Sequence, residues 1–200
     1  PQSYQLIVNR VFDSDHNVLS QQVQNYTDSS KGLLLDMQEI RNTSFDTRGN
    51  VLSQRVATFD TLDPSTLLDI KVITNEGIDS LGNVSKTTIL KYESGSIDGA
   101  HSNFIDATVI QTLKFDLWGN ALEQEITKYS DIGKATLLDR QVITSTYDVV
   151  RSRATTSTII SYNSLNQFID KQLISYQAYD LYNNVIDQTI TRFDILDNAI

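Results

Sequence analysis

The stretch "SFDTRGNVLSQRVATFD", residues 44–60, runs from one Phe-Asp pair to the next with a Gly-Asn pair between them. In Asp46-x-x-Gly49-Asn50 the Asp side chain can accept backbone N–H bonds, while Gly and Asn tolerate the positive φ of a tight reversal. After the turn, side chains alternate with a period of two, which is typical of a β-strand. We predict that the face carrying Leu52, Gln54, Val56 and Thr58 points inward, and that the face carrying Val51, Ser53, Arg55, Ala57 and Phe59 points outward. The stretch is therefore a turn followed by a strand.

The same pattern recurs along the whole chain. Pairs of an aromatic or Ile residue with Asp begin at residues 12, 45, 78, 115, 147 and 179, so that successive copies lie 33, 33, 37, 32 and 32 residues apart. Five residues into most copies stands an Asn, and fourteen residues in stands Tyr or Phe. Internal repeats of this length indicate a modular architecture.

A second signature fills the rest of each unit. It consists of two large apolar residues followed by Asp, as in Leu34-Leu35-Asp36 and Leu67-Leu68-Asp69, with an Ile four residues later. This half predicts a return strand, reached through a longer connection rich in Ser, Asp and Lys. Apolar residues do not recur at helical spacing, so a helical fold is disfavoured.

These patterns predict an all-β fold of tandem two-strand β-hairpin repeats that form an extended, continuous antiparallel sheet. Whether the sheet spirals or forms a solenoid stays open. We expect about twelve strands of eight to ten residues in a single array over 1–200, with units starting near residues 12, 45, 78, 115, 147 and 179. Both ends of the array are expected to be cut in the middle of a unit. The extra residues of the third unit, Ser94 to Asn103, are expected in a connection.

Composition narrows the classes of function. The formal net charge is −9 and the basic residues are dispersed singly, which argues against nucleic-acid binding. The absence of Cys excludes a disulfide framework and a thiolate zinc site. No apolar run approaches the length of a bilayer span, so membrane insertion is not expected.

The turn motif is similar to the YD repeats of the bacterial Rhs and toxin-complex proteins, which are also found in teneurins. The segments that carry the resemblance are "FDTRGNV" (45–51), "FDLWGNA" (115–121) and, more loosely, "IDSLGNV" (78–84), "YDLYNNV" (179–185) and "FDSDHNV" (12–18). The resemblance implies hairpins that spiral into a hollow shell around a toxic cargo, with no catalysis by the repeats. This chain departs from that pattern in its period near 33, its separate Leu-Leu-Asp signature and its fewer Gly and Tyr residues.

One motif has the spacing of a metal site. Asp13-x-Asp15-x-Asn17 matches the opening of a calcium loop, but Val18 and Gln24 stand where such a loop needs Gly and a bidentate acid. Capping of the turn by Asp and Asn accounts for the same residues. We predict an Asx-type turn, with weak surface calcium as the alternative, and no catalytic, cofactor-binding or metal-binding residue and no cofactor.

Four other side chains or pairs invite a functional interpretation. His16 and His101 are expected to be exposed residues of connections, because neither has a partner at catalytic or ligand spacing. Trp118, inside "DLWGN", is expected to cover an adjacent connection, with a role in sugar or partner binding as the alternative. Arg151 and Arg153 replace the Gly-Asn pair in the fifth unit, as a drifted repeat or a local interaction site.

A row of glutamines is the most suggestive feature. If successive units stack in register, Gln21, Gln54, Gln124 and Gln188 lie near one another, and their amides can bond along the stack. The alternative is a solvated row.

The sequence thus favours a non-enzymatic structural repeat segment of a large secreted or cell-surface bacterial protein, such as a fibre, stalk, adhesin or surface layer. Its expected partners are further copies of the repeat or the rest of a larger chain, with self-assembly as an option. The alternative is a Rhs-like shell segment that encloses a toxin.

Overall fold

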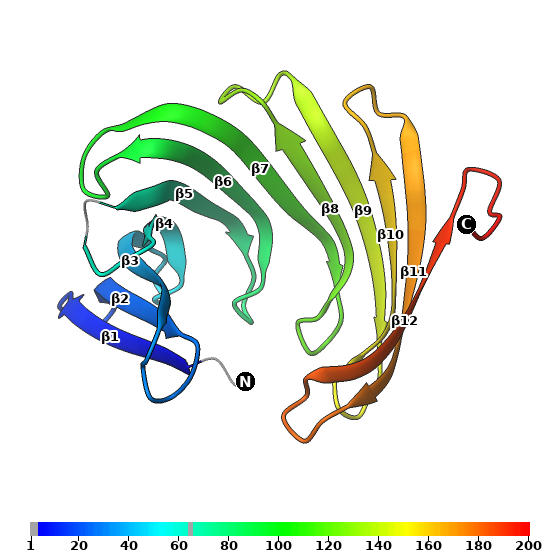
Figure 1. Ribbon diagram of the computed structural model, residues 1–200, viewed down its shortest axis with the longest axis horizontal. Coiled ribbons are helices and arrows are strands. Elements are labelled where there is room, and N and C mark those ends of the chain that lie inside the picture. The colour runs from blue at the N-terminus through cyan, green and yellow to red at the C-terminus, as the bar shows by residue number, and fades with distance from the viewer. Residues whose placement is uncertain (1–3, 64–65) are drawn as a thin grey trace. The chain divides into compact units, whose positions relative to one another are not determined.

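The computed structural model describes residues 4–63 and 66–200, which form twelve β-strands and no helix. The strands lie in one antiparallel sheet in the order β1 to β12, so each strand is hydrogen-bonded to its neighbours in the sequence (Figure 1). The bounds are β1 Tyr4–Phe12, β2 Val18–Tyr26, β3 Leu34–Phe45, β4 Val51–Phe59, β5 Leu67–Ile78, β6 Val84–Gly95, β7 His101–Phe115, β8 Ala121–Tyr129, β9 Leu137–Tyr147, β10 Ala154–Tyr162, β11 Phe168–Tyr179 and β12 Val185–Phe193. The predicted all-β fold of tandem hairpins is confirmed.

Aromatic residues mark where the strands end. Every described strand except β5 and β6 ends in Phe or Tyr. In β1 to β4 and β8 to β11 this residue pairs with the first residue of the next strand, as Phe45 does with Val51 and Phe59 with Leu67. The large rings suit the half-buried surface of a sheet, and at most strand ends the aromatic residue pairs with an aliphatic one beside the turn. Aromatic closure therefore occurs at both ends of the hairpins, although the Asp-x-x-Gly-Asn signature occurs once per two strands.

The strands divide between two compact units. Unit 1 comprises Pro1–Ile78 and Thr87–Ala107, and unit 2 comprises Asp79–Lys86 and Thr108–Ile200. Unit 1 therefore contains β1 to β5 with most of β6 and the first half of β7. Unit 2 contains the start of β6, the rest of β7, and β8 to β12.

Unit 1 has a small apolar core on one face of the sheet. Met37 and Ile70 are 1% and 0% exposed, and they pack with Ala57 and Phe59, while Ile97 lies against them. The predicted inward face was wrong for this cluster, because Ala57 and Phe59 belong to the face expected to point outward. The reason is long-range, since the tip of the β6–β7 hairpin, which includes Ile97, covers that face. Val56 on the opposite face is also buried.

The extra residues of the third unit, Ser94 to Asn103, lie in the β6–β7 hairpin. They were expected in a connection, but they lengthen the strands, because β6 continues to Gly95 and β7 begins at His101. The remaining link, 96–100, is a tight turn. Asn163–Gln167, between β10 and β11, forms the same kind of turn, so the expected longer connection is found after β2, β4 and β8 but not there.

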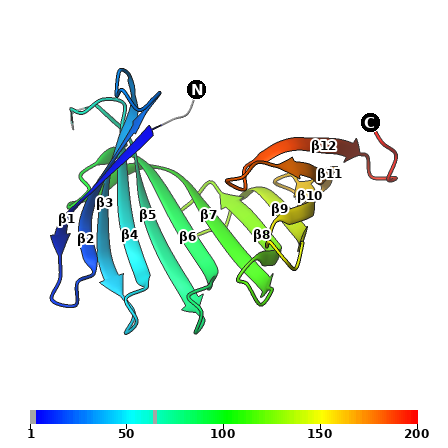
Figure 2. The same ribbon diagram turned by 90° about the horizontal axis from the view of Figure 1, so that it is seen from below.

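In unit 1 the meander places the motif turns together. The β1–β2 and β3–β4 turns lie at one end of the strands, and the longer β2–β3 connection lies at the other end (Figure 2). The strand order thus sets turns that are 33 residues apart in sequence side by side, as their contacts below show.

Unit 2 buries hydroxyl groups more completely than apolar side chains. Its most buried described residues are Thr112, Thr127, Ser145 and Ser157. Ser145 and Ser157 lie opposite each other on β9 and β10, and their hydroxyl oxygens are 2.8 Å apart. A buried hydroxyl needs a hydrogen-bond partner, and here the facing strand supplies it.

Candidate functional site

The Asp-x-x-Gly-Asn motif builds a three-residue hairpin loop. At residues 46–50 the Gly49 N–H donates to the Asp46 carbonyl at 3.1 Å, and the Asp46 N–H donates to the Asn50 carbonyl at 2.9 Å. This is a type I turn followed by a residue at positive φ. Asp46 Oδ1 accepts the N–H groups of Arg48 and Asn50, and Asp46 Oδ2 accepts Asn50 Nδ2 at 2.9 Å.

The other turns repeat this geometry. Asp13, Asp79, Asp116, Asp180 and Asp194 cap their turns in the same way. The predicted Asx-type turn is confirmed. Positive φ occurs at the fourth position of the motif, held by His16, Gly49, Gly82, Gly119, Asn183 and Asp197. The turn after Asp148 is one residue longer, and there the positive φ falls on Ser152. The Asn at the fifth position does not adopt it, so its role is to bond the Asp.

These hydrogen bonds shift the acidity of the turn carboxylates. The side-chain bond from Asn50, together with the backbone N–H groups of Asn50 and Arg48, lowers the pKa of Asp46 to about 2. The side chains of Asn17, Asn83 and Asn120 are the largest cause of a lowered pKa at Asp13, Asp79 and Asp116. Hydrogen bonds to the charged form favour that form, so the turn carboxylates are ionised at neutral pH.

Neighbouring turns touch through a fixed pair of positions. A Cβ built on Gly49 would lie 2.7 Å from Asn17 Oδ1, and one on Gly119 would lie 2.5 Å from Asn83 Oδ1. In the drifted turn, Asn120 Nδ2 bonds the Ser152 hydroxyl. The fifth position of one turn therefore contacts the fourth position of the next turn, within each unit.

Arg153 makes the same contact with a longer side chain. Its Nε donates to Asn183 Oδ1 at 2.8 Å, and its guanidinium lies over the Tyr179 ring at 5.1 Å from the centroid. The arginine pair was expected as a drifted repeat or a local interaction site. Arg153 is the last residue of a turn that is one residue longer than the others, so it takes the place of the Asn at the fifth position. It binds Asn183, the fourth residue of the next turn.

The glutamine row does not form a ladder of glutamines. Gln21 Nε2 donates to Asn9 Oδ1 at 2.6 Å, and Gln54 Nε2 donates to Asn42 Oδ1 at 2.7 Å. Gln124 bonds Thr112 in the same way. Each of these partners lies across the same hairpin, because the next Gln of the row is two strands away, and strands are spaced at about 4.8 Å.

At four boundaries a further side-chain donor links one hairpin to the next. Asn42 Nδ2 donates to the carbonyl of Val18 at 2.8 Å, and Asn75 Nδ2 donates to the carbonyl of Val51 at 3.0 Å. Both carbonyls belong to the first residue of an even-numbered strand, beyond the last pair of its ladder with the following strand. In unit 2 the donors are tyrosine hydroxyls. The Tyr147 hydroxyl donates to the carbonyl of Ala121, and the Tyr179 hydroxyl donates to the carbonyl of Ala154.

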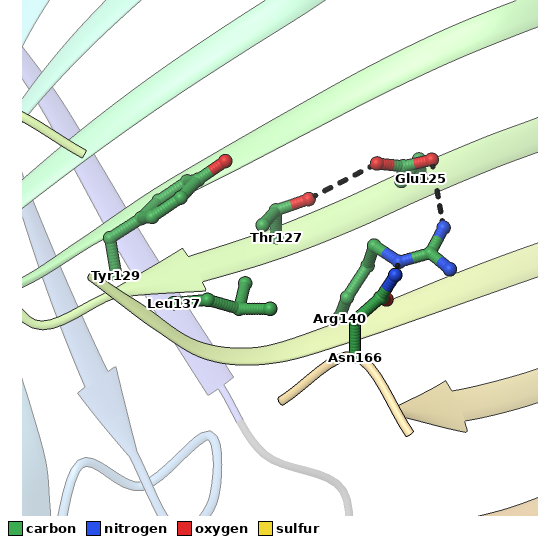
Figure 3. A pocket seen from close by; sticks show the side chains of 6 residues that line it. All are labelled: Glu125, Thr127, Tyr129, Leu137, Arg140 and Asn166. Atoms are coloured by element: carbon green, nitrogen blue, oxygen red, sulfur yellow. Dashed lines mark hydrogen bonds and ion pairs between the residues drawn. The ribbon is translucent and has the colours of Figure 1, made fainter. Parts of the chain in front are cut away.

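Unit 2 also has a shallow hollow of about 460 Å³, lined by Glu125, Thr127, Tyr129, Leu137, Arg140 and Asn166. Figure 3 shows Arg140 between Glu125 and Asn166, with hydrogen bonds of 3.2 Å to Glu125 Oε2 and 3.0 Å to Asn166 Oδ1. The guanidinium lies over the Tyr162 ring, 4.1 Å from the centroid. Arg140 thus binds the β10–β11 turn to the sheet. Glu125, Thr127, Arg140 and Asn166 are hydrogen-bonded to one another.

The remaining residues singled out in the sequence differ from expectation. His101 begins β7 instead of lying in a connection, with its ring 5.2 Å from that of Tyr92. Burial, and to a smaller extent the charge of Arg55, lowers the pKa of His101. Trp118 does not cover a connection, since its exposed fraction is 70%. His16 is exposed in its turn, as expected.

Among residues 4–63 and 66–200, no group of three or more His, Asp or Glu side chains is placed to hold a metal ion. The same part of the chain contains no helix long and apolar enough to cross a membrane. Comparison with known proteins finds no matching family model and no matching curated protein.

Proposed function

We propose that this chain is a non-catalytic structural repeat segment of a larger secreted or cell-surface bacterial protein, which builds a fibre, stalk, adhesin or surface layer. One observation carries the proposal. Most of the polar residues that recur with the repeat are hydrogen-bonded within a hairpin or between adjacent hairpins, as in the relay from Gln54 to Asn42 to the Val18 carbonyl. Residues that recur in this way hold neighbouring strands and hairpins of the array together.

The spacing of these contacts supports the proposal further. In repeat proteins, stability is approximately a sum of unit terms and nearest-neighbour terms, so units are exchangeable. The contact from the fifth position of one turn to the fourth position of the next is a nearest-neighbour term of this kind. It is made by Asn17 in unit 1 and by Asn83, Asn120 and Arg153 in unit 2.

The test is the removal of one whole period from unit 2. Deleting residues 115–146 joins Lys114 to Tyr147, so that Tyr147-Asp148 enters a turn where Phe115-Asp116 did, and the alternation of side chains is preserved. The shortened chain should remain soluble and rich in β-structure by circular dichroism, with a modestly lower melting temperature.

Deleting residues 45–77 from unit 1 is the matched comparison. It also removes one period, but it takes away Ala57, Phe59 and Ile70, on which Ile97 packs. This second deletion should therefore cost clearly more stability. If the deletion of residues 115–146 instead gives an unfolded or aggregated chain, the units are not exchangeable and the proposal fails.

A further inference from the structure

The second and third positions of the motif turns are apolar in unit 2 and polar in unit 1. In the turns after β7, β9 and β11 these positions are held by Leu117 and Trp118, Val149 and Val150, and Leu181 and Tyr182. In the turns after β1 and β3 they are held by Ser14 and Asp15, and by Thr47 and Arg48. Both sets of turns are capped by Asp in the same way, so the apolar residues are not needed to form the turn.

The six apolar residues, which we call the apolar turn row, protrude from the same end of the strands of unit 2 (Figure 1). Their exposed fractions lie between 70% and 96%. Asn120 bonds Ser152 and Arg153 bonds Asn183, so the three turns stand side by side. Because strands are spaced at about 4.8 Å, successive turns are about 10 Å apart. Leu81, in the turn after β5, extends the row.

Neighbouring repeats of a longer chain would not cover the apolar turn row. They would add strands beside β1 or β12, whereas the row lies at the ends of the strands, across the direction in which the sheet grows. Added turns would lengthen the row. A contiguous set of exposed apolar side chains marks an interaction surface.

We propose that the apolar turn row binds a lipid surface, with its side chains inserted into the headgroup region of a bilayer. This inference goes beyond the structural-repeat function and does not depend on it. Two features of the turns, their shape and their internal hydrogen bonds, favour a bilayer over a folded protein as the partner.

The shape of the row suits a fluid partner. Each turn presents a convex pair of side chains, and successive pairs are separated by polar residues. A folded protein would need a series of pockets at the same spacing, because protein interfaces match in shape. Lipids rearrange around a protruding side chain, so they need no such match. Trp and Tyr, as at Trp118 and Tyr182, also favour the boundary between water and hydrocarbon.

The hydrogen bonds within the turns lower the cost of leaving water. The Trp118 N–H donates to Asp116 Oδ1 at 2.8 Å, and the Gly119 N–H donates to the Asp116 carbonyl at 3.2 Å. The Tyr182 N–H donates to Asp180 Oδ1 at 2.8 Å in the same way. A backbone N–H that leaves water without a partner is costly, and these groups already have one.

The charge beside the row sets the depth of insertion and the kind of lipid. Hydrogen bonds within the turns lower the pKa of Asp116, Asp148 and Asp180, so a charged carboxylate stands next to each apolar pair. Charged carboxylates are costly in hydrocarbon, so insertion stops at the headgroup boundary and no turn spans the bilayer. Because the chain carries a net charge of −9, binding depends on apolar contact and should be stronger on zwitterionic than on anionic lipid.

Trp118 is the one tryptophan of the chain, so its fluorescence reports the row directly. We expect phosphatidylcholine vesicles to shift its emission to shorter wavelength, and lipids brominated near the headgroup end of the acyl chain to quench it. Vesicles that also contain phosphatidylglycerol should bind the chain more weakly. Salt at about 0.15 M should reduce this difference, because it screens the repulsion.

A matched pair of double variants tests which residues make the contact. Leu117→Ser with Leu181→Ser keeps Trp118 and should lower vesicle binding at least about tenfold in co-sedimentation, because two apolar side chains no longer leave water. Ile132→Ser with Leu165→Ser removes two exposed apolar side chains from the opposite end of the strands of unit 2 and should leave binding unchanged. The melting temperatures of both should stay close to that of the parent, since all four residues are exposed.

Three results would overturn the proposal. Emission that vesicles leave unchanged up to millimolar lipid would exclude the lipid surface, and an equal loss of binding in the two double variants would place the contact outside the row. A shift that grows with protein concentration without lipid, and is lost in Leu117→Ser with Leu181→Ser, would make a second copy of the chain the partner. None of these results bears on the exchangeability of the units, which the period deletion tests.

Discussion

At the scale of single residues, each turn depends on one Asp, one Asn and one residue at positive φ. The Asp carboxylate is charged and hydrogen-bonded, and the residue at the fourth position faces the Asn of the preceding turn, as Gly49 faces Asn17. Glycine meets both demands, since it has no Cβ and no penalty at positive φ. The charge of the Asp carboxylate and the absence of a Cβ at the fourth position each lead to a measurable prediction.

The first prediction concerns how the stability of the chain depends on pH. The folded pKa of Asp46 is about 2, below its ordinary 3.8, so the unfolded chain takes up protons first as the pH falls. The stability contributed by the turn carboxylates is therefore complete above about pH 4 and is lost as the pH falls towards about 2. We expect a melting temperature that is flat from pH 7 to 5 and declines steeply below 4. Asp46→Asn should reduce that decline, and an unchanged slope would contradict this account.

The second prediction concerns the glycine at the fourth position of the turn. At Gly119 φ is +84°, and a Cβ would lie 2.5 Å from Asn83 Oδ1, so Gly119→Ala should destabilise the chain by about 1–3 kcal/mol. Gly32→Ala is the control, because its Cβ would lie 3.5 Å from the Ser30 hydroxyl and its backbone is not in the left-handed region. That variant should stay within about 0.5 kcal/mol of the parent. Denaturant titration of both variants measures the difference.

At the scale of elements, the β6–β7 hairpin differs from the others in length and in what its tip contacts. Arg55 donates to the Ile97 carbonyl at 3.1 Å, and Arg41 lies 3.2 Å from the Asp98 carboxylate. These bonds hold the tip over the core of unit 1. The longer strands thus serve to bring Ile97 to Ala57 and Phe59.

Shortening Ile97 should consequently loosen unit 1. Ile97→Ala is expected to lower the free energy of unfolding by about 1–2 kcal/mol, since the side chain is partly buried against the core. Ile105→Ala removes the same atoms from an exposed position of the same hairpin and should cost less than about 0.5 kcal/mol. Equal losses in urea titrations followed by circular dichroism would mean that the tip is not part of the core.

The strands and turns also show which features of the fold can be predicted from local sequence. Strands and motif turns were predictable because alternation and the Asp-Gly-Asn chemistry act within a few residues. The inward face was not, because it depends on Ile97, some forty residues away from Ala57. The partners of Gln54 and Val18 were missed for the same reason, although the recurrence of Asn three residues before Phe12, Phe45 and Ile78 was a signal in the sequence.

At the scale of the whole molecule, the charged turns raise the question of calcium. Both oxygens of Asp46 and of its equivalents accept hydrogen bonds from their own turn, so an ion would have to displace them. We expect millimolar calcium to change the melting temperature by less than about 2 °C. A rise of many degrees that a chelator reverses would show that the turns rearrange into a binding loop.

The contact between successive turns bears on how such a chain changes over generations. Within each unit, successive hairpins meet through equivalent positions of their turns. Recombination between two misaligned copies of the gene, with crossover at equivalent codons, therefore deletes or duplicates one whole hairpin and joins matching surfaces. The variants that arise differ in length and keep the contacts between their turns. Selection can then adjust length in steps of one period, independently of the residues that face the solvent.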